Sequence, residues 1–305
     1  MIDRPSHTST LIPRIFVFIL LALTYPLANA ADSAVLPTHQ AIPGGVAVLK
    51  LPVATSNQAV FYNNKRVLIK DEGQTRYAIV GIPLTAKTGK HQLRISHEQG
   101  KTTIIPFTVT AKNYATQHIK LQNKRMVNPS AEDLVRIRQE QQISQQAFNL
   151  FSDNTEVTTR FIYPVSGRLS SPFGLRRFFN GEEKRPHSGL DIAAPEDTPI
   201  IAPAAGTVVA VGEFFYNGNT VFIDHGQGLV TMYCHMNRID VRQGQKIRQG
   251  EILGVVGMTG RATGPHLHFS VSLNDVRVEP LLFLPDNPPS ESNQQPDILP
   301  TPDNK

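Results

Sequence analysis

The chain has 305 residues, of which 40% are hydrophobic and 18% are charged, with a formal net charge of +5. This length allows about two domains with a core each, and the composition excludes a wholly disordered chain. The positive charges are scattered without a long basic run. They therefore fit an acidic neighbourhood, or serve solubility alone, and they give no reason to expect nucleic-acid binding.

The first 30 residues are typical of a secretory signal. Arg4 and Arg14 flank a short polar start, the apolar run IFVFILLAL follows at 15–23, and Ala-Asn-Ala at 28–30 has the spacing of a cleavage site. The nine apolar residues of this run fall short of the roughly 20 that span a bilayer, which argues against an uncleaved anchor. We expect cleavage after Ala30 and export to the periplasm or cell envelope, with no membrane span left in the mature protein.

Residues 31–115 are predicted to form a small β-sandwich, immunoglobulin-like only by architectural analogy. β-branched segments such as VAVLKL (46–51) and TTIIPFTVT (102–110) are separated by turn residues, and Asn63-Asn64 indicates a hairpin. Strands at this spacing are typical of two packed antiparallel sheets.

A helical linker at 116–160 is predicted to join this sandwich to a second β region. Ser130 and Asp133 make a helix start, and no Gly or Pro interrupts the next twenty residues. Residues 161–284 are again rich in strands and glycine turns, which favours a curled antiparallel sheet. The fold class is therefore mainly β, and the polar tail at 285–305 is expected to be disordered.

The segment GPHLHF (264–269) carries two histidines with one residue between them. Side chains alternate in direction along a strand, so His266 and His268 share one face while Leu267 and Phe269 share the other. The apolar face belongs to a core. The two imidazoles are therefore expected to lie on the open side.

The same alternation in TMYCHM (231–236) presents a third imidazole, that of His235. Tyr233 should face the same way, either at the edge of a cleft or as a packing residue. Cys234 should lie on the apolar side as a small buried hydrophobe. Because it is the only cysteine, no intramolecular disulfide can form.

In RPHSGLDIAAP (185–195), His187 and Asp191 lie four residues apart on an extended or looped segment. Histidine and aspartate are good Zn²⁺ ligands, and a catalytic zinc takes three protein ligands and a water molecule. The histidine pair of the strand could supply the third ligand. The His266/His268 pair and the His187/Asp191 pair are each a weak signal alone, but together with His235 within one β domain they favour a metal site. His225, in a turn at the end of a strand, is interpreted as structural.

Residues 160–284 resemble the lysostaphin-type zinc endopeptidases, which cut peptidoglycan peptides. The resemblance rests on five segments in one order: SSPFGLRR, HSGLDIAAPEDTPI, AAGTVVAVG, GNTVFIDHGQGLVTMYCHM and VRQGQKIRQGEILGVVGMTGRATGPHLHF. It implies that one Zn²⁺ is bound by His187, Asp191 and His268. It also implies that His266 and His235 are catalytic.

The function implied is an exported zinc endopeptidase that hydrolyses peptide cross-links of peptidoglycan. No His-Glu-x-x-His motif supplies a carboxylate base, so a histidine must take that role. We assign His266 as base and His235 as a donor to the oxyanion, and these two roles could be exchanged. Further candidates are Arg176, for a substrate carboxylate or a salt bridge, and Asn219 and Thr220, for substrate backbone or a turn.

Two other functions stay open. A catalytically silent scaffold could activate another cell-wall hydrolase, and the complete ligand set argues against it. A zinc D,D-carboxypeptidase would differ in its products. The first domain is expected either to cover the cleft or to bind a regulatory protein.

Overall fold

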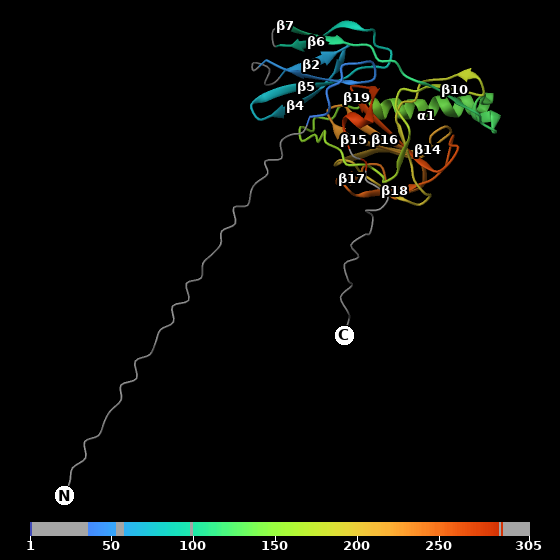
Figure 1. Ribbon diagram of the computed structural model, residues 1–305. Helices are drawn as coiled ribbons and strands as arrows, with labels where there is room; N and C mark the ends of the chain where they lie inside the picture. Colours follow the sequence, from blue (N-terminus) through green and yellow to red (C-terminus); the bar gives the residue numbers. More distant parts are fainter. Residues whose placement is uncertain (2–35, 53–57, 98–99, 287, 289–305) are drawn as a thin grey trace. The chain divides into compact units, whose positions relative to one another are not determined.

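The computed structural model describes residues 1, 36–52, 58–97, 100–286 and 288, all of which except Met1 belong to the compact unit Ala34–Lys305 (Figure 1). The predicted signal segment and the predicted disordered tail fall almost wholly outside these residues. Within the described part of the chain, no helix has the length and apolar character needed to cross a membrane.

The N-terminal region is a sandwich of two antiparallel sheets, as predicted. One sheet has three strands, in the order β1 (Val46–Lys50), β5 (Thr75–Gly81) and β4 (Leu68–Glu72). The other has four, in the order β3 (Lys65–Arg66), β2 (Ala59–Tyr62), β6 (Gly89–Ser96) and β7 (Thr102–Val109). The hairpin between β2 and β3 turns at Asn63 and Asn64, with φ of 47° and 62°, the left-handed pair that a two-residue turn requires.

The three-stranded sheet of the sandwich is buried on both faces. Ala78 and Val80 of β5 belong to the sandwich core, whereas Ile79 between them belongs to the larger core of the C-terminal region. The alternation of side chains along a strand explains how one strand serves two cores. The side chain of Asn274 adds a buried polar link, accepting from Gly81 N at 2.8 Å and donating to Gly81 O at 3.2 Å.

The linker contains the predicted helix, α1 (Ala131–Asn149), but its first residues are not helical. Strand β8 (Thr116–Ile119) comes first and pairs in parallel with β10 (Arg176–Phe179), and the 3-10 turn η2 (Lys124–Met126) follows. A segment of four residues is too short to show strand periodicity, so the pairing was not predicted. Ser130 caps α1 in a capping box with Asp133, as expected.

Helix α1 packs against the outer face of the C-terminal sheet (Figure 1). Its Phe148 ring meets the Phe222 ring edge-on, with centroids 5.4 Å apart. The side chain of Glu140 also accepts from Phe215 N at 2.8 Å. The helix is thereby fixed beside the strands that carry the histidines.

The C-terminal region is one ten-stranded sheet, antiparallel in all its pairings, which confirms the predicted architecture. Its main path runs through β17 (Lys246–Ile247), β14 (Gly206–Phe214), β15 (Gly218–Gly226), β16 (Leu229–Ile239), β19 (His266–Leu273), β12 (Leu190–Ala193) and β9 (Arg168–Ser171). Off this path lie β13 (Pro199–Ile201), β18 (Ile252–Val256) and β20 (Val276–Val278). Two short elements remain in the described part of this region. They are β11 (Glu182–Glu183), which pairs with β10, and the 3-10 turn η3 (Pro280–Leu282).

His225, at the end of β15, is part of a buried chain of hydrogen bonds. Its Nδ1 donates to Ala205 O at 2.7 Å, because a carbonyl oxygen can only accept. Its Nε2 therefore accepts from Thr231 Oγ1 at 2.8 Å, and that oxygen accepts from the Tyr233 hydroxyl at 2.8 Å. This position fits the structural role predicted for His225, and burial lowers the pKa of its imidazole to about 4.

Acid should therefore destabilise the protein through His225. The pKa is lower in the folded state than in the unfolded chain, so its contribution is complete above pH 6.5 and is lost as the pH falls toward 4. At pH 5 the loss amounts to about 2 kcal/mol of unfolding free energy. Urea unfolding at pH 7.5 and pH 5 should show a smaller difference for His225→Gln than for the wild type. The exposed His39→Gln should keep the wild-type difference, and an equal difference in all three proteins would contradict this role of His225.

Candidate metal centre and active site

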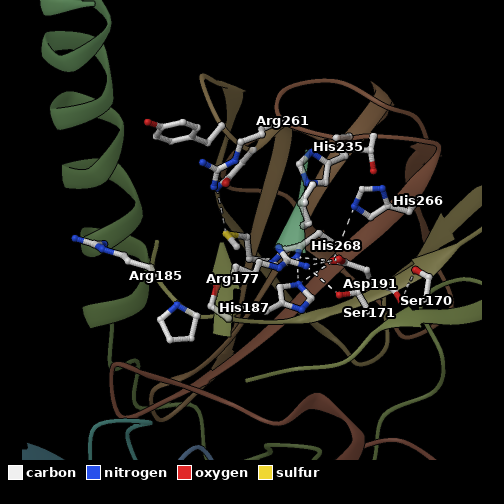
Figure 2. Close-up of a pocket in the computed structure, with 18 of the residues that line it drawn as sticks. Ser170, Ser171, Arg177, Arg185, His187, Asp191, His235, Arg261, His266 and His268 are labelled. Carbon is white, nitrogen blue, oxygen red and sulfur yellow. Dashed lines mark hydrogen bonds and ion pairs between the residues drawn. The ribbon is translucent and has the colours of Figure 1, made fainter. Parts of the chain in front are cut away.

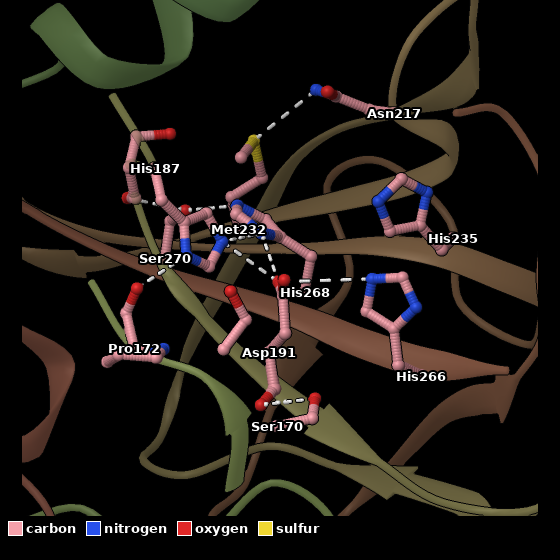
Figure 3. A network of polar contacts seen from close by, with 12 residues as sticks. Ser170, Pro172, His187, Asp191, Asn217, Met232, His235, His266, His268 and Ser270 are labelled. Carbon is pink, nitrogen blue, oxygen red and sulfur yellow. Dashed lines mark hydrogen bonds and ion pairs between the residues drawn. The ribbon is translucent and has the colours of Figure 1, made fainter. Parts of the chain in front are cut away.

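Three side chains from two strands and one loop, those of His187, Asp191 and His268, converge on a single point (Figure 3). Asp191 on β12 lies directly opposite His268 on β19 in the antiparallel register. Asp191 Oδ1 lies 2.8 Å from His268 Nδ1 and 2.9 Å from His187 Nε2, and the two nitrogens are 3.0 Å apart. The backbone of His187 is fixed by bonds with Leu175 O and Gly174 N at 2.9 Å and 2.8 Å.

The outward bonds of the two histidines decide where their protons lie. His187 Nδ1 is 2.7 Å from Pro172 O, a pure acceptor, so this nitrogen carries the proton. His268 Nε2 is 2.9 Å from Ser270 Oγ, which itself donates to Ser188 O at 3.0 Å and so accepts from the ring. When neutral, both rings therefore direct a lone pair toward Asp191 Oδ1. Three acceptors that face one another without a proton between them fit a shared cation.

The charge states of these residues suit metal binding. Burial lowers the pKa of His268 to about 4, so the ring is neutral at pH 7. Burial acts to raise the pKa of the Asp191 carboxyl, but the close polar contacts with His187 and His268 outweigh it and hold that pKa below its ordinary value. A metal ligand must be deprotonated, and the ionised Asp191 and the neutral His268 meet this condition.

Arg177 fixes the orientation of the Asp191 carboxylate. Its Nη2 donates to Asp191 Oδ2 at 2.8 Å, which leaves Oδ1 to face the histidines. The same nitrogen lies 3.0 Å from Ser171 Oγ, and Nε donates to Gln117 Oε1 at 3.2 Å. The candidate predicted from the sequence was the neighbour Arg176, and Arg177 was missed.

The two predicted catalytic histidines lie beside the metal-ligand group, with ring centroids 4.7 Å apart. His266 Nδ1 donates to Gly264 O and His235 Nδ1 donates to Thr259 O, each at 2.8 Å. The Nε2 of each neutral ring is therefore free to accept a proton. His266 Nε2 lies 3.9 Å from Asp191 Oδ1, and burial, with the neighbouring His266 and His268, lowers the pKa of His235 to about 3.

The prediction that Tyr233 faces the same way as His235 is wrong. Tyr233 is fully buried in the main core, whereas Met232 lines the pocket with His235. His235 has a φ of 62°, in the left-handed region, and the register of β16 with β15 shifts between Tyr233 and Met236, the stretch that contains it. This irregularity breaks the alternation and turns His235 toward the pocket. Cys234 is buried, as predicted.

Three further sequence candidates lie outside the pocket. Arg176 forms an exposed salt bridge with Glu183 at 2.9 Å, in line with the structural alternative. Asn219 donates to Met236 O and Asn237 O and so links β15 to β16, and Thr220 Oγ1 donates to Gly218 O at the start of β15.

A pocket of about 750 Å³ opens over the metal-ligand group and both catalytic candidates (Figure 2). Helix α1 contributes Gln141, Ser144, Gln145 and Phe148 to its wall, and residues near β8 contribute Gln117, Ile119 and Leu121. Among the described residues, none from 36–115 lines it. The expectation that the first domain covers the cleft is thus not met, because the linker forms that wall instead.

Fold and site together define a mainly β protein with a three-residue metal centre and two accessory histidines at the base of one pocket. A sequence model described as peptidase family M23 matches residues 185–280, and one described as the peptidase family M23 N-terminal domain matches 39–112. The crystal structure of a putative peptidase M23 from Pseudomonas aeruginosa is 42% identical, with a TM-score of 0.68, and the match covers 80% of this chain and 95% of that one. The protein therefore belongs to peptidase family M23.

Two relatives are named here, and each is similar to part of the chain. The DD-carboxypeptidase/endopeptidase Mpg of Neisseria meningitidis is 43% identical over 117 residues, which are 38% of this chain and 27% of Mpg. The peptidoglycan DD-endopeptidase ShyA of Vibrio cholerae is 40% identical over 134 residues, which are 43% of this chain and 30% of ShyA. The chain thus spans less than a third of the length of these two relatives.

The hydrogen bond between Ser270 and His268 provides a test of the metal centre that spares all three ligands. Ser270→Ala removes the acceptor for His268 Nε2, so the ring is no longer held in the tautomer that presents Nδ1. We expect zinc affinity to fall about 10- to 100-fold, measured by competition with a chromogenic chelator.

Ser272→Ala is the matched control. Ser272 lies two residues further along β19, and its buried hydroxyl has no hydrogen-bond partner among the described residues. It should keep the wild-type affinity. Equal losses in both variants, or none in Ser270→Ala, would contradict the assignment of His268 Nδ1 as the ligand atom.

Proposed function

We propose that this protein is an exported zinc endopeptidase that hydrolyses peptide cross-links of bacterial peptidoglycan. The observation that carries the proposal is the convergence of His187, Asp191 and His268 within one pocket that also holds His235 and His266. Support for the substrate comes from ShyA, a relative named as a peptidoglycan DD-endopeptidase. Two arguments support export: the predicted signal at 1–30, and the location of peptidoglycan outside the cytoplasm.

The metal would be zinc, one ion per chain, held by His187 Nε2, Asp191 Oδ1 and His268 Nδ1. Two imidazoles and a single carboxylate oxygen are typical of catalytic zinc sites. A zinc ion there supplies Lewis acidity, which polarises a carbonyl group and lowers the pKa of a water molecule toward neutrality.

His266 is the proposed general base. Of the two accessory histidines it has the ring nitrogen within 4 Å of Asp191 Oδ1, and that nitrogen is an acceptor in the neutral ring. It can take the proton from the attacking water and return it to the amine that leaves when the peptide bond breaks. Arg177 acts through Asp191 as a positioning residue.

His235 is suited to accept a hydrogen bond at Nε2 and not to donate one. Its Nδ1 proton is committed to Thr259 O, so donation to an oxyanion would require a second proton on Nε2. Because burial lowers the pKa of His235 to about 3, the ring is neutral at pH 7 and accepts at Nε2. We therefore propose that His235 orients the water or the substrate N–H as an acceptor, and that His266 alone carries the transferred proton.

A D,D-carboxypeptidase activity is the second candidate, because the relative Mpg is named for both activities. A silent scaffold is disfavoured by the complete set of ligands and accessory histidines. Binding of a regulatory protein to the sandwich domain remains a prediction.

The proposed roles are separable by two substitutions. His187→Ala should abolish both zinc binding and hydrolysis, whereas His266→Gln should retain zinc and lose about 10²- to 10⁴-fold in kcat, because only proton transfer is removed. Zinc content is measured by metal analysis, and products released from defined cross-linked muropeptides are identified by mass spectrometry.

His39→Gln, at an exposed site outside the pocket, is the control and should behave as the wild type. Hydrolysis unchanged in His187→Ala would refute the zinc endopeptidase. Release of terminal D-alanine without cleavage of cross-links would select the carboxypeptidase instead.

A further inference from the structure

The charges that line the pocket are strongly unbalanced. Five arginines face a single carboxylate, that of Asp191; the arginines are Arg168, Arg177, Arg185, Arg261 and Arg277. Arg177 is paired with Asp191, and the other four have no ion-pair partner among the described residues. A bound divalent cation would add to this positive charge. Such a pocket attracts a ligand that carries negative charge.

Arg261 is the arginine of this set whose guanidinium contacts two aromatic rings. Its guanidinium carbon lies 4.5 Å from the centroid of the Phe179 ring and 4.3 Å from that of Tyr216. The one hydrogen bond of its guanidinium to the described protein is a long one, 3.4 Å from Nη1 to Met126 O. The rings fix the plane of the guanidinium but use none of its N–H groups, so most of its donors remain available to a ligand.

The loop that carries Arg261 also positions both catalytic candidates. It runs from Gly257 to His266, and its ends are joined by a bond from His266 N to Gly257 O at 3.2 Å. Thr259 O accepts from His235, and Arg261 N donates to Tyr216 O at 2.8 Å. Figure 2 shows Arg261 between helix α1 and His235 around the same opening. Arg261 is therefore fixed relative to the site of bond cleavage.

We propose that Arg261 is a specificity residue that binds a free carboxylate of the peptide substrate, so that the enzyme selects anionic peptides over neutral ones. This inference rests on the proposed function. A planar guanidinium with unpaired N–H groups binds a carboxylate through two parallel hydrogen bonds, which a neutral amide cannot reproduce. The partial burial of Arg261 strengthens the contact, although the ion remains positively charged because burial lowers its pKa only to about 10.

The experiment compares two forms of one synthetic cross-linked peptide, with its carboxylates free or converted to amides. The zinc-loaded full chain should show a KM about tenfold or more higher for the amidated form, with kcat changed less than about threefold. Arg261→Gln should raise KM for the carboxylate form by a similar factor and leave KM for the amidated form within about twofold.

The exposed Arg248→Gln removes the same charge outside the pocket and should match the wild type on both forms. Zinc content and the unfolding midpoint are measured for each variant. A purely structural role for Arg261 would slow both peptide forms equally, and that result overturns the inference.

The comparison on the wild type alone keeps the inference testable if Arg261→Gln does not fold. Equal KM for the two forms overturns the role of Arg261 while leaving the endopeptidase intact. Cleavage of neither form, with zinc bound, overturns the proposed function itself and the inference with it.

Discussion

The arrangement of the site depends on three acceptor atoms that are forced to face one another. His187 Nε2, Asp191 Oδ1 and His268 Nδ1 lie within 3.0 Å of each other, and the outer bonds to Pro172 O and Ser270 Oγ keep the protons of both rings on the far side. Without a cation this contact would be repulsive, since no proton stands between the lone pairs. The surrounding fold therefore holds an arrangement that a bound cation would make favourable.

Rigid elements hold each part of this arrangement. Register within the sheet sets Asp191 against His268, and backbone bonds on both sides hold His187. Arg177 takes the second oxygen of Asp191, so the carboxylate can offer only the first. Strand pairing thus sets the geometry of the three candidate ligands, and this geometry underlies the chemistry that we propose for His266.

Local patterns in the sequence were enough to predict part of this site. Alternation along β19 correctly assigned Leu267 and Phe269 to the core and His266 and His268 to the open side. The same rule failed at Tyr233, because the left-handed backbone of His235 is a local irregularity that composition does not reveal. Alternation also requires Arg176 and Arg177 to face opposite ways, but it cannot say which one meets Asp191.

Contacts between residues far apart in the sequence could not be predicted from one sequence. The parallel pairing of β8 with β10 joins segments about 60 residues apart, and nothing in TQHI indicates its partner. The fold class and helix α1 were predictable because periodicity and capping are local. The contacts of the Arg261 guanidinium with the Phe179 and Tyr216 rings join residues far apart in the sequence, so they could not be predicted from local patterns.

The sheet β1-β5-β4, which serves two cores at once, has a consequence for how the protein loses its structure. Val46, Leu68 and Ile79 fill the C-terminal core from the sandwich side, so separating the two regions would open apolar surface on both. Because such exposure is unfavourable, the two regions should melt together in one cooperative transition. Hinge motion at this junction is thereby disfavoured, so the junction can act as a rigid base for the pocket that α1 lines.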